Sequence, residues 1–228
     1  MKPIIQLAET RTPGGKRLVL SQHDGAYSLV TDGLPLMTSR EHESELALAR
    51  LGCAHIVSKP APHVLIGGLG LGFTLRQTLD MLQPGAHVVV AELLPDVVEW
   101  NRTTLGELTG HALDDSRVAV HVGDVVDIVR EVEQPFDAIL IDIDNGPEAI
   151  SDDHDHPLYG REGLQRVVQA MTPQGCLAIW SAGIDQRFER RVRGQGLQAK
   201  AVQVPAYKGA KARSKCIWVV TPSTSART

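Results

Sequence analysis

The chain has 228 residues, of which 43% are hydrophobic and 22% charged, and its formal net charge is -4. This composition is that of a folded globular protein, and it argues against extensive disorder and against a nucleic-acid partner. No apolar run approaches the roughly 20 residues of a membrane span, and the N-terminus lacks the apolar stretch of a signal peptide. Three well-separated cysteines form no CxxC motif and no disulfide framework. We therefore expect a cytoplasmic protein without a membrane partner.

The first forty residues predict a small region of β-hairpins. Short runs rich in β-branched and aromatic residues indicate strands at Ile4–Thr10, Arg17–Ser21 and Tyr27–Thr31. The turn sequences Pro13-Gly14-Gly15 and His23-Asp24-Gly25 separate them, and such short connections are typical of antiparallel hairpins.

Residues 41–222 predict a Rossmann-like α/β domain. The helices are expected at Glu41–Ile56, Leu71–Leu82, Pro95–Leu108, Val125–Val132, Arg161–Met171 and Gln186–Arg193. The strands are expected at His63–Ile66, His87–Ala91, Val118–Val122, Ala138–Ile141, Cys176–Ser181, Gln198–Val204 and Cys216–Thr221. This alternation predicts a doubly wound, mostly parallel seven-stranded sheet, and the final pair without a helix between its strands predicts an antiparallel edge strand. Residues 223–228 are expected to be a frayed tail.

The strongest motif is the glycine turn Gly67-Gly68-Leu69-Gly70-Leu71-Gly72, between the first parallel strand and the helix that follows it. Its glycines, Gly67, Gly68, Gly70 and Gly72, permit a tight turn and a close approach of a ligand to the backbone. Glu92 ends the next strand, where a carboxylate can accept hydrogen bonds from both hydroxyls of a ribose. Together these residues predict a nucleoside site, whereas a plain βα turn and an exposed acid are the alternatives.

Three further acids follow strands at the same edge of the sheet. Gly123-Asp124 follows the third parallel strand, where Asp124 either accepts a hydrogen bond from an adenine amino group or caps the next helix. Asp142 and Asp144 follow the fourth, and their alternation with apolar residues places both carboxylates on one side. Such a pair suits an amine substrate and supplies a general base, although a turn into Asn145-Gly146-Pro147 explains one of the two acids.

The segment Ser151-Asp152-Asp153-His154-Asp155-His156 contains several metal-binding residue types. We find no matching distant cluster, so we expect an acidic lid and no metal site, with metal binding as the minor alternative.

Together, these features resemble the spermidine synthase family of aminopropyltransferases, which has the S-adenosylmethionine-dependent methyltransferase fold. The resemblance covers most of the chain and is carried by the glycine turn, Glu92, Gly123-Asp124, the run from Phe136 to Asp142, Asp32-Gly33 with Thr38, Arg40 and Glu45, and Pro157-Leu158-Tyr159. It implies that Glu92 holds the ribose and Asp124 the adenine end of the donor. It also implies that Asp142 deprotonates the attacking amine and that Asp144 orients it.

The chain departs from the family pattern at positions that matter for the donor. Gly70 replaces an aspartate that grips the donor's amino group in the family, Leu36 replaces a glutamine, and Ser44 stands where a tyrosine is expected. The paired-acid motif is also one residue shorter. Without the aspartate, the carboxylate of S-adenosylmethionine is tolerated beside Gly70 and the helix N-terminus.

Our hypothesis from the sequence is therefore a methyltransferase that uses S-adenosylmethionine on a small-molecule acceptor, such as an amine. The first alternative is an aminopropyltransferase that uses decarboxylated S-adenosylmethionine and a diamine. A non-catalytic nucleoside-binding protein and a dinucleotide-dependent oxidoreductase are rival functions from other classes. The edges of the N-terminal hairpins favour a homodimer.

Overall fold

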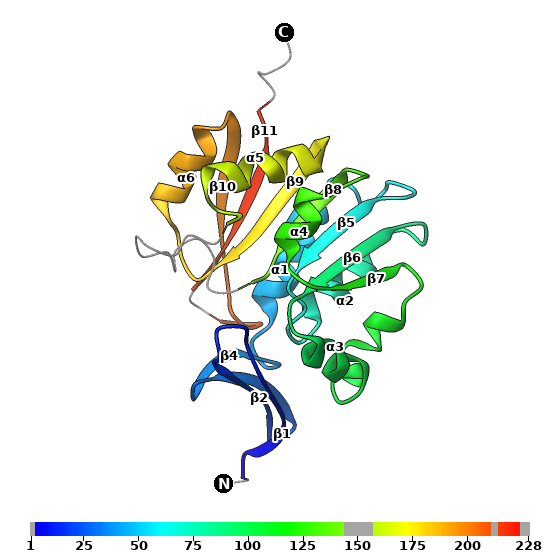
Figure 1. Ribbon diagram of the computed structural model, residues 1–228, viewed down its shortest axis with the longest axis vertical. Helices are drawn as coiled ribbons and strands as arrows, with labels where there is room; N and C mark the ends of the chain where they lie inside the picture. The colour runs from blue at the N-terminus through cyan, green and yellow to red at the C-terminus, as the bar shows by residue number, and fades with distance from the viewer. Residues whose placement is uncertain (1–2, 144–156, 211–213, 224–228) are drawn as a thin grey trace.

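The structure is a computed structural model that describes residues 3–143, 157–210 and 214–223, and its strands form two sheets (Figure 1). The N-terminal sheet is antiparallel, and its strands lie in the order β1 (Ile5–Arg11), β2 (Arg17–His23), β3 (Ala26–Thr31) and β4 (Leu34–Thr38). Strand β4 is additional to the three predicted ones. Pro35 obscures it in the sequence, but a proline is compatible with a strand at the edge of a sheet. Asp32 and Gly33, with φ angles of 48° and 79°, form the short turn that precedes it.

The second sheet confirms the predicted fold class. Its seven strands are β5 (His63–Gly67), β6 (His87–Glu92), β7 (Val118–Val122), β8 (Phe136–Ile141), β9 (Met171–Ser181), β10 (Leu197–Val204) and β11 (Lys215–Pro222). They lie in the order β10-β11-β9-β8-β5-β6-β7. Strands β5 to β9 are parallel, and β11 is antiparallel to both of its neighbours, so that an antiparallel pair closes one end of the sheet.

Helices cover both faces of this sheet because the central strands are apolar on both sides. The helices are α1 (Glu43–Cys53), α2 (Phe73–Met81), α3 (Pro95–Arg102), α4 (Val125–Arg130), α5 (Arg161–Ala170) and α6 (Gln186–Arg193). Along β8, Ala138 and Leu140 belong to the core shared with α1, α2 and α3. Ile139 and Ile141 belong to the core shared with α4, α5 and α6. The alternation of strand side chains thus divides the apolar core into two layers.

One predicted helix is shorter than expected. The sequence predicts a helix over Pro95–Leu108, but α3 ends at Arg102, and a separate 3-10 helix covers Gly106–Thr109. The β-branched pair Thr103-Thr104 and the following Gly106 have weak helix propensity, and the backbone leaves the helical region at Thr103. The apolar residues beyond Arg102 are still buried, as Leu105 shows, which explains why their spacing resembles a helix.

The order of the strands reverses between β5 and β8, and in open α/β sheets ligands bind at the carboxyl ends of the strands on either side of such a point. The N-terminal sheet lies beside these carboxyl ends (Figure 1). Thr10 on β1 donates a 2.6 Å hydrogen bond to Asp96 at the start of α3, which links the two sheets. Among the helices of the described ranges, none is long and apolar enough to cross a membrane.

Candidate active site

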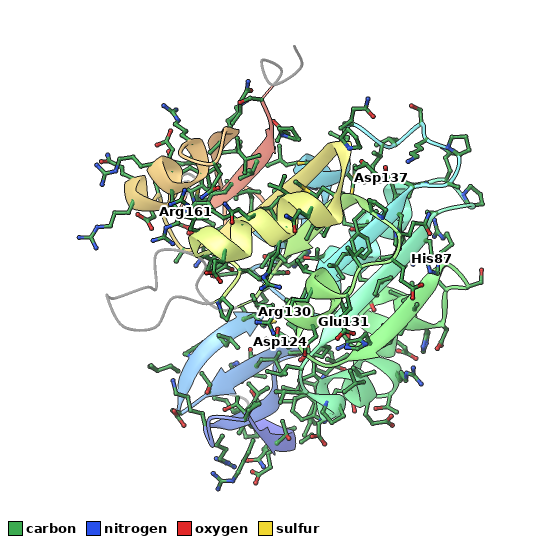
Figure 2. The ribbon with its side chains drawn as sticks, turned by 45° about the horizontal axis from the view of Figure 1, so that its top comes forward. His87, Asp124, Arg130, Glu131, Asp137 and Arg161 are labelled. Atoms are coloured by element: carbon green, nitrogen blue, oxygen red, sulfur yellow. The ribbon has the colours of Figure 1, made fainter. Side chains whose placement is uncertain are left out.

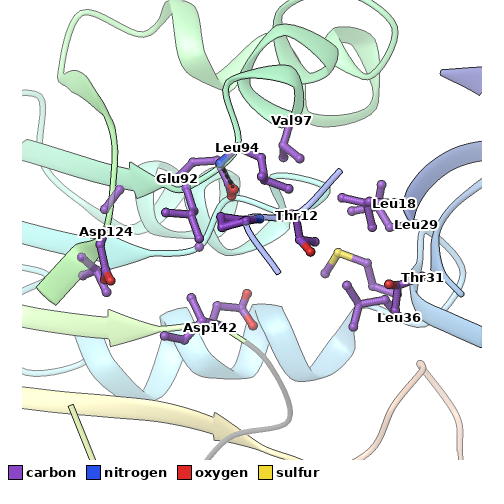
Figure 3. Close-up of a pocket in the computed structure, with 18 of the residues that line it drawn as sticks. Thr12, Leu18, Leu29, Thr31, Leu36, Glu92, Leu94, Val97, Asp124 and Asp142 are labelled. Atoms are coloured by element: carbon purple, nitrogen blue, oxygen red, sulfur yellow. Dashed lines mark hydrogen bonds between the residues drawn. The ribbon is translucent and has the colours of Figure 1, made fainter. Parts of the chain in front are cut away.

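A cavity of about 540 Å³ lies between the carboxyl edge of the large sheet and the N-terminal sheet. Figure 3 shows Glu92 and Asp124 on one side of it, and Leu18 and Leu36 on the opposite side, with Asp142 between the two. The volume is within the range of pockets that hold small molecules and cofactors. We call the part with Glu92 and Asp124 the nucleoside half, and the part with Leu18 and Leu36 the acceptor half.

The glycine turn forms the floor between the halves. Gly68 and Gly70 line the cavity, with φ angles of 91° and 52°. A Cβ atom on Gly68 would lie 2.4 Å from the backbone oxygen of Asp142, so only glycine lets these two segments approach so closely. Gly67 and Gly72 lie behind the turn, where they permit close packing of side chains. The structure therefore brings two of the four predicted glycines to the cavity.

Glu92 is buried at the end of β6 and holds the glycine turn in place. One of its carboxylate oxygens, Oε2, accepts a 2.9 Å hydrogen bond from the backbone N–H of Leu69, and Oε1 accepts a 3.0 Å bond from that of Leu94. Burial raises the pKa of Glu92, and the backbone donors act in the opposite direction. The backbone N–H groups of Gly70 and Leu93 also act on this carboxylate. Because Glu92 borders the cavity, its oxygens face the place where a ribose binds in folds of this kind.

Gly123 and Asp124 line the nucleoside half from the end of β7. Asp124 Oδ1 accepts a 2.9 Å hydrogen bond from the backbone N–H of Val126, so Asp124 caps helix α4. The capping role that the sequence left open is therefore present. Because Asp124 also borders the cavity, its carboxylate is available to a ligand as well.

Asp142, which is partly buried, shares the cavity with a buried acid, Glu45, which comes from helix α1. Thr74 Oγ1 donates a 2.6 Å hydrogen bond to Asp142 Oδ2, and Ser44 Oγ lies 2.5 Å from Glu45 Oε2. Burial and the neighbouring Glu45 raise the pKa of Asp142 to about 7, against the effect of Thr74. Burial also raises the pKa of Glu45. Two adjacent carboxyl groups withdrawn from water favour the binding of a cation, which relieves their repulsion.

The sequence analysis did not include Glu45 among the site residues. Glu45 precedes Leu48 and Ala49 by three and four residues, so it lies on the buried stripe of its helix. An acid on an apolar stripe is the signal that indicates a functional role. The predicted Asp144 and the segment from Ser151 to His156 lie outside the described residues. Within the described ranges, no group of three His, Cys, Asp or Glu side chains is arranged to hold a metal ion.

The family model and the curated relatives that match this chain describe the same kind of protein. The family described as Spermine/spermidine synthase domain matches residues 49–189. The polyamine aminopropyltransferase of Mycobacterium tuberculosis is 34% identical over 131 residues, which are 54% of this chain and 23% of that protein. The corresponding enzyme of Sulfolobus acidocaldarius is 30% identical over 115 residues, 50% of this chain and 37% of that protein. The chain thus spans less than half the length of these curated relatives.

Solved structures agree on the fold. The spermidine synthase from Thermotoga maritima aligns with a TM-score of 0.71 at 19% identity, over 95% of this chain and 72% of that one. A spermidine synthase in complex with the transition-state analogue AdoDATO aligns with a TM-score of 0.70 at 18% identity, over 95% and 71% of the two chains.

The sheet and its connections define a Rossmann-like, methyltransferase-type fold, with the glycine turn and the acids at the carboxyl edge around one cavity. The family match covers more than half of the chain. The chain therefore belongs to the spermine/spermidine synthase family, as its sequence motifs indicated.

These findings contradict the hypothesis of methyl transfer, since the family and the relatives above point to aminopropyl transfer. The prediction of methyl transfer was wrong because it inferred the charge of the donor site from the glycine at position 70 alone. In the folded protein, the carboxyl group of Glu45 lines the same cavity and adds negative charge to it. A site with both Glu45 and Asp142 disfavours the carboxylate of S-adenosylmethionine.

Proposed function

We propose that the protein is an aminopropyltransferase, which transfers the aminopropyl group of decarboxylated S-adenosylmethionine to a small amine. The observation that carries the proposal is the pair of Glu45, which is buried, and Asp142, which is partly buried, in the cavity beside the glycine turn. The pair offers negative charge for a donor that has an ammonium group and no carboxylate. Two such acids without a cation are costly, and an ammonium group offsets that cost with charge-assisted hydrogen bonds.

The nucleoside half suits the adenosine part of the donor. In this proposal Glu92 accepts hydrogen bonds from the ribose hydroxyls, and Asp124 from the adenine amino group, since both line the cavity. Gly68 leaves the backbone open to the sulfonium side of the donor. In this arrangement Glu45 holds the donor's ammonium group and provides the charge that Gly70 lacks.

In the transfer, the lone pair of the acceptor amine attacks the propyl carbon that is bonded to the sulfonium sulfur. The carbon–sulfur bond breaks, its electron pair remains on sulfur, and 5′-methylthioadenosine leaves as a neutral thioether. The proton of the acceptor nitrogen passes to Asp142, whose pKa of about 7 suits a base that works near neutral pH. Alignment of the nitrogen with the carbon–sulfur bond supplies much of the rate.

A binding experiment tests the donor. Trp180 lines the cavity, whereas Trp100 and Trp218 are buried in the core, so tryptophan fluorescence reports binding. We expect decarboxylated S-adenosylmethionine to bind at least tenfold more tightly than S-adenosylmethionine. Equal or tighter binding of S-adenosylmethionine contradicts the proposal.

A turnover experiment tests the chemistry. With the decarboxylated donor and an amine, we expect release of 5′-methylthioadenosine, measured by mass spectrometry. Asp142→Asn removes the base, so we expect turnover to fall at least a hundredfold while the affinity for 5′-methylthioadenosine, which has no ammonium group, changes little. The proposed role of Asp142 fails if this variant turns over at the rate of the wild type. The predicted orienting role of Asp144, the homodimer and the cytoplasmic location remain predictions.

A further inference from the structure

The acceptor half of the cavity has an apolar wall, which the N-terminal sheet supplies. Leu18 on β2, Leu29 on β3, and Leu36 and Met37 on β4 line the cavity together. Figure 3 shows Leu18, Leu29 and Leu36 grouped on the side of the cavity opposite Asp124. This wall therefore faces the part of a ligand that extends beyond the nucleoside.

Met37 extends the apolar wall to the glycine turn. A Cβ atom on Gly70 would lie 2.7 Å from Met37 Sδ and 2.9 Å from Met37 Cε, so the thioether packs directly over this glycine. The wall is thus continuous with the floor of the cavity. An alkyl chain that lies along it exchanges water for carbon and sulfur neighbours.

Few of the described carboxyl groups line the acceptor half, so few ammonium groups can bind there. Among the described residues, Glu45 and Asp142 are the acids that line this half. Thr74 Oγ1 lies 2.6 Å from Asp142 Oδ2 and 3.5 Å from the backbone oxygen of Glu45, so the two acids are neighbours. The charged side chain that the hairpin between β1 and β2 adds to the lining is a cation, Lys16. A second cation, Lys215 Nζ, lies 5.0 Å from the centre of the Trp180 ring, which also lines the cavity.

We propose that the acceptor is an amphipathic alkyl monoamine, with its one amino group at Asp142 and its alkyl chain along Leu18, Leu29, Leu36 and Met37. This inference rests on the proposed aminopropyl transfer and specifies its substrate class. A diamine of the same length places a second ammonium group against the leucines, where it loses its hydration and none of the cavity-lining residues in the described ranges offers it a carboxyl group. The alkyl chain has no such cost, and each methylene that it buries strengthens binding about fourfold.

Two acceptors of nearly equal size test the proposal. n-Pentylamine and 1,4-diaminobutane differ by a methyl group in place of an ammonium group. With decarboxylated S-adenosylmethionine as the donor, kcat/KM is measured from the release of 5′-methylthioadenosine and the mass of the product. We expect n-pentylamine to exceed the diamine at least tenfold, and n-hexylamine to exceed n-pentylamine further. A preference for the diamine overturns the monoamine proposal and leaves aminopropyl transfer intact. If 5′-methylthioadenosine is released in the absence of any amine, both the proposed aminopropyl transfer and the monoamine proposal are wrong.

A pair of variants on β4 tests the wall itself. Leu36 is half exposed, so Leu36→Gln is expected to fold, and it adds a polar group to the acceptor half. We expect it to lower kcat/KM for n-pentylamine about fivefold to tenfold and to leave the affinity for 5′-methylthioadenosine unchanged. Leu34→Gln on the same strand is the matched control, because Leu34 is exposed and outside the cavity lining. Equal effects of the two variants overturn the proposal.

Discussion

Asp137 and Asp142 lie at opposite ends of strand β8, and their carboxyl groups have opposite surroundings. Asp137 accepts hydrogen bonds from Lys59 Nζ at 2.6 Å and from the backbone N–H of His63 at 2.8 Å. Burial alone would raise the pKa of Asp137, but these donors outweigh burial and lower it. Asp142 has one hydroxyl donor and an acidic neighbour, so its pKa is raised to about 7. Figure 2 shows Asp137 at the end of the sheet away from Asp124, and thus away from the cavity. One strand therefore has an acid with a lowered pKa at one end and an acid with a raised pKa at the other.

Glu45→Gln is expected to change both the pH profile and the donor affinity. Because the charge of Glu45 raises the pKa of Asp142, its removal lowers that pKa, and the acidic limb of the kcat profile moves to lower pH. The affinity for decarboxylated S-adenosylmethionine falls about tenfold, since the ammonium group loses a charge-assisted hydrogen bond. The affinity for 5′-methylthioadenosine, which has no ammonium group, stays the same.

Glu43→Gln is the matched control for this prediction. Glu43 lies on the same helix and pairs with Arg50 outside the cavity, so its substitution leaves the pH profile and both affinities unchanged. If Glu45→Gln and Glu43→Gln behave alike, Glu45 has no part in donor binding.

Thr74→Val is expected to move the pH profile in the opposite direction. Thr74 Oγ1 donates to Asp142 Oδ2 and so lowers the pKa of Asp142. Without this hydrogen bond the pKa rises, the base is protonated at higher pH, and the acidic limb of kcat moves upward. Thr74→Ser keeps the hydroxyl group and is expected to restore the profile. Thr78→Val, which alters a hydroxyl on the same helix that bonds to a backbone oxygen, leaves the profile unchanged. An unshifted limb in Thr74→Val excludes this role of the hydroxyl group.

Asp142→Asn is expected to stabilise the fold at high pH. The pKa of Asp142 is 3.8 in the unfolded chain and about 7 in the folded protein, so between these values the folded protein holds a proton that the unfolded chain has lost. Stability therefore falls as the pH rises from about 4 to 7. At pH 8 the asparagine variant escapes this cost and gains on the order of 4 kcal/mol. Thermal unfolding at pH 8 and pH 4.5 measures the difference, which is much smaller at the lower pH. A variant less stable than the wild type at pH 8 contradicts the prediction.

Local sequence patterns predicted the large sheet well because its strands and helices follow the alternation that burial on both faces requires. Errors arose where two local signals disagreed. Pro35 obscured strand β4, and the apolar residues after Arg102 extended the predicted helix beyond α3. In both places the tertiary packing decides, since an edge position accepts the proline and a 3-10 turn buries Leu105.

The candidate site was predictable where its residues follow strands. Parallel strands bring their carboxyl ends together, so the sequence alone predicts Glu92, Asp124 and Asp142 at one edge of the sheet. Glu45 was missed as a site residue because it comes from a helix that precedes the sheet, and only the packing of α1 brings it to Asp142. The prediction of S-adenosylmethionine as the donor was wrong for the same reason, because it left out the negative charge that Glu45 adds to the cavity.

Asp137→Asn is expected to destabilise the fold and to leave the cavity unchanged. The substitution removes the charge that Lys59 and the backbone N–H of His63 stabilise at a nearly buried position, at a cost of about 2–3 kcal/mol. Because the folded pKa of Asp137 is lowered, its contribution is present above the unfolded value of 3.8 and is lost as the pH falls through the folded value. Urea denaturation at pH 7 measures the loss, and the gap to the wild type narrows toward pH 3.

Asp80→Asn is the matched control, because Asp80 pairs with Arg76 on an exposed helix surface and its loss costs less than about 0.5 kcal/mol. The affinity for 5′-methylthioadenosine stays at the wild-type value in both variants. This separates Asp137 from Asp142 at the other end of β8, since Asp142→Asn is expected to have the opposite effect on stability at high pH and to lower turnover at least a hundredfold. An Asp137→Asn variant as stable as the wild type at pH 7 shows that the hydrogen bonds of Asp137 contribute no net stability.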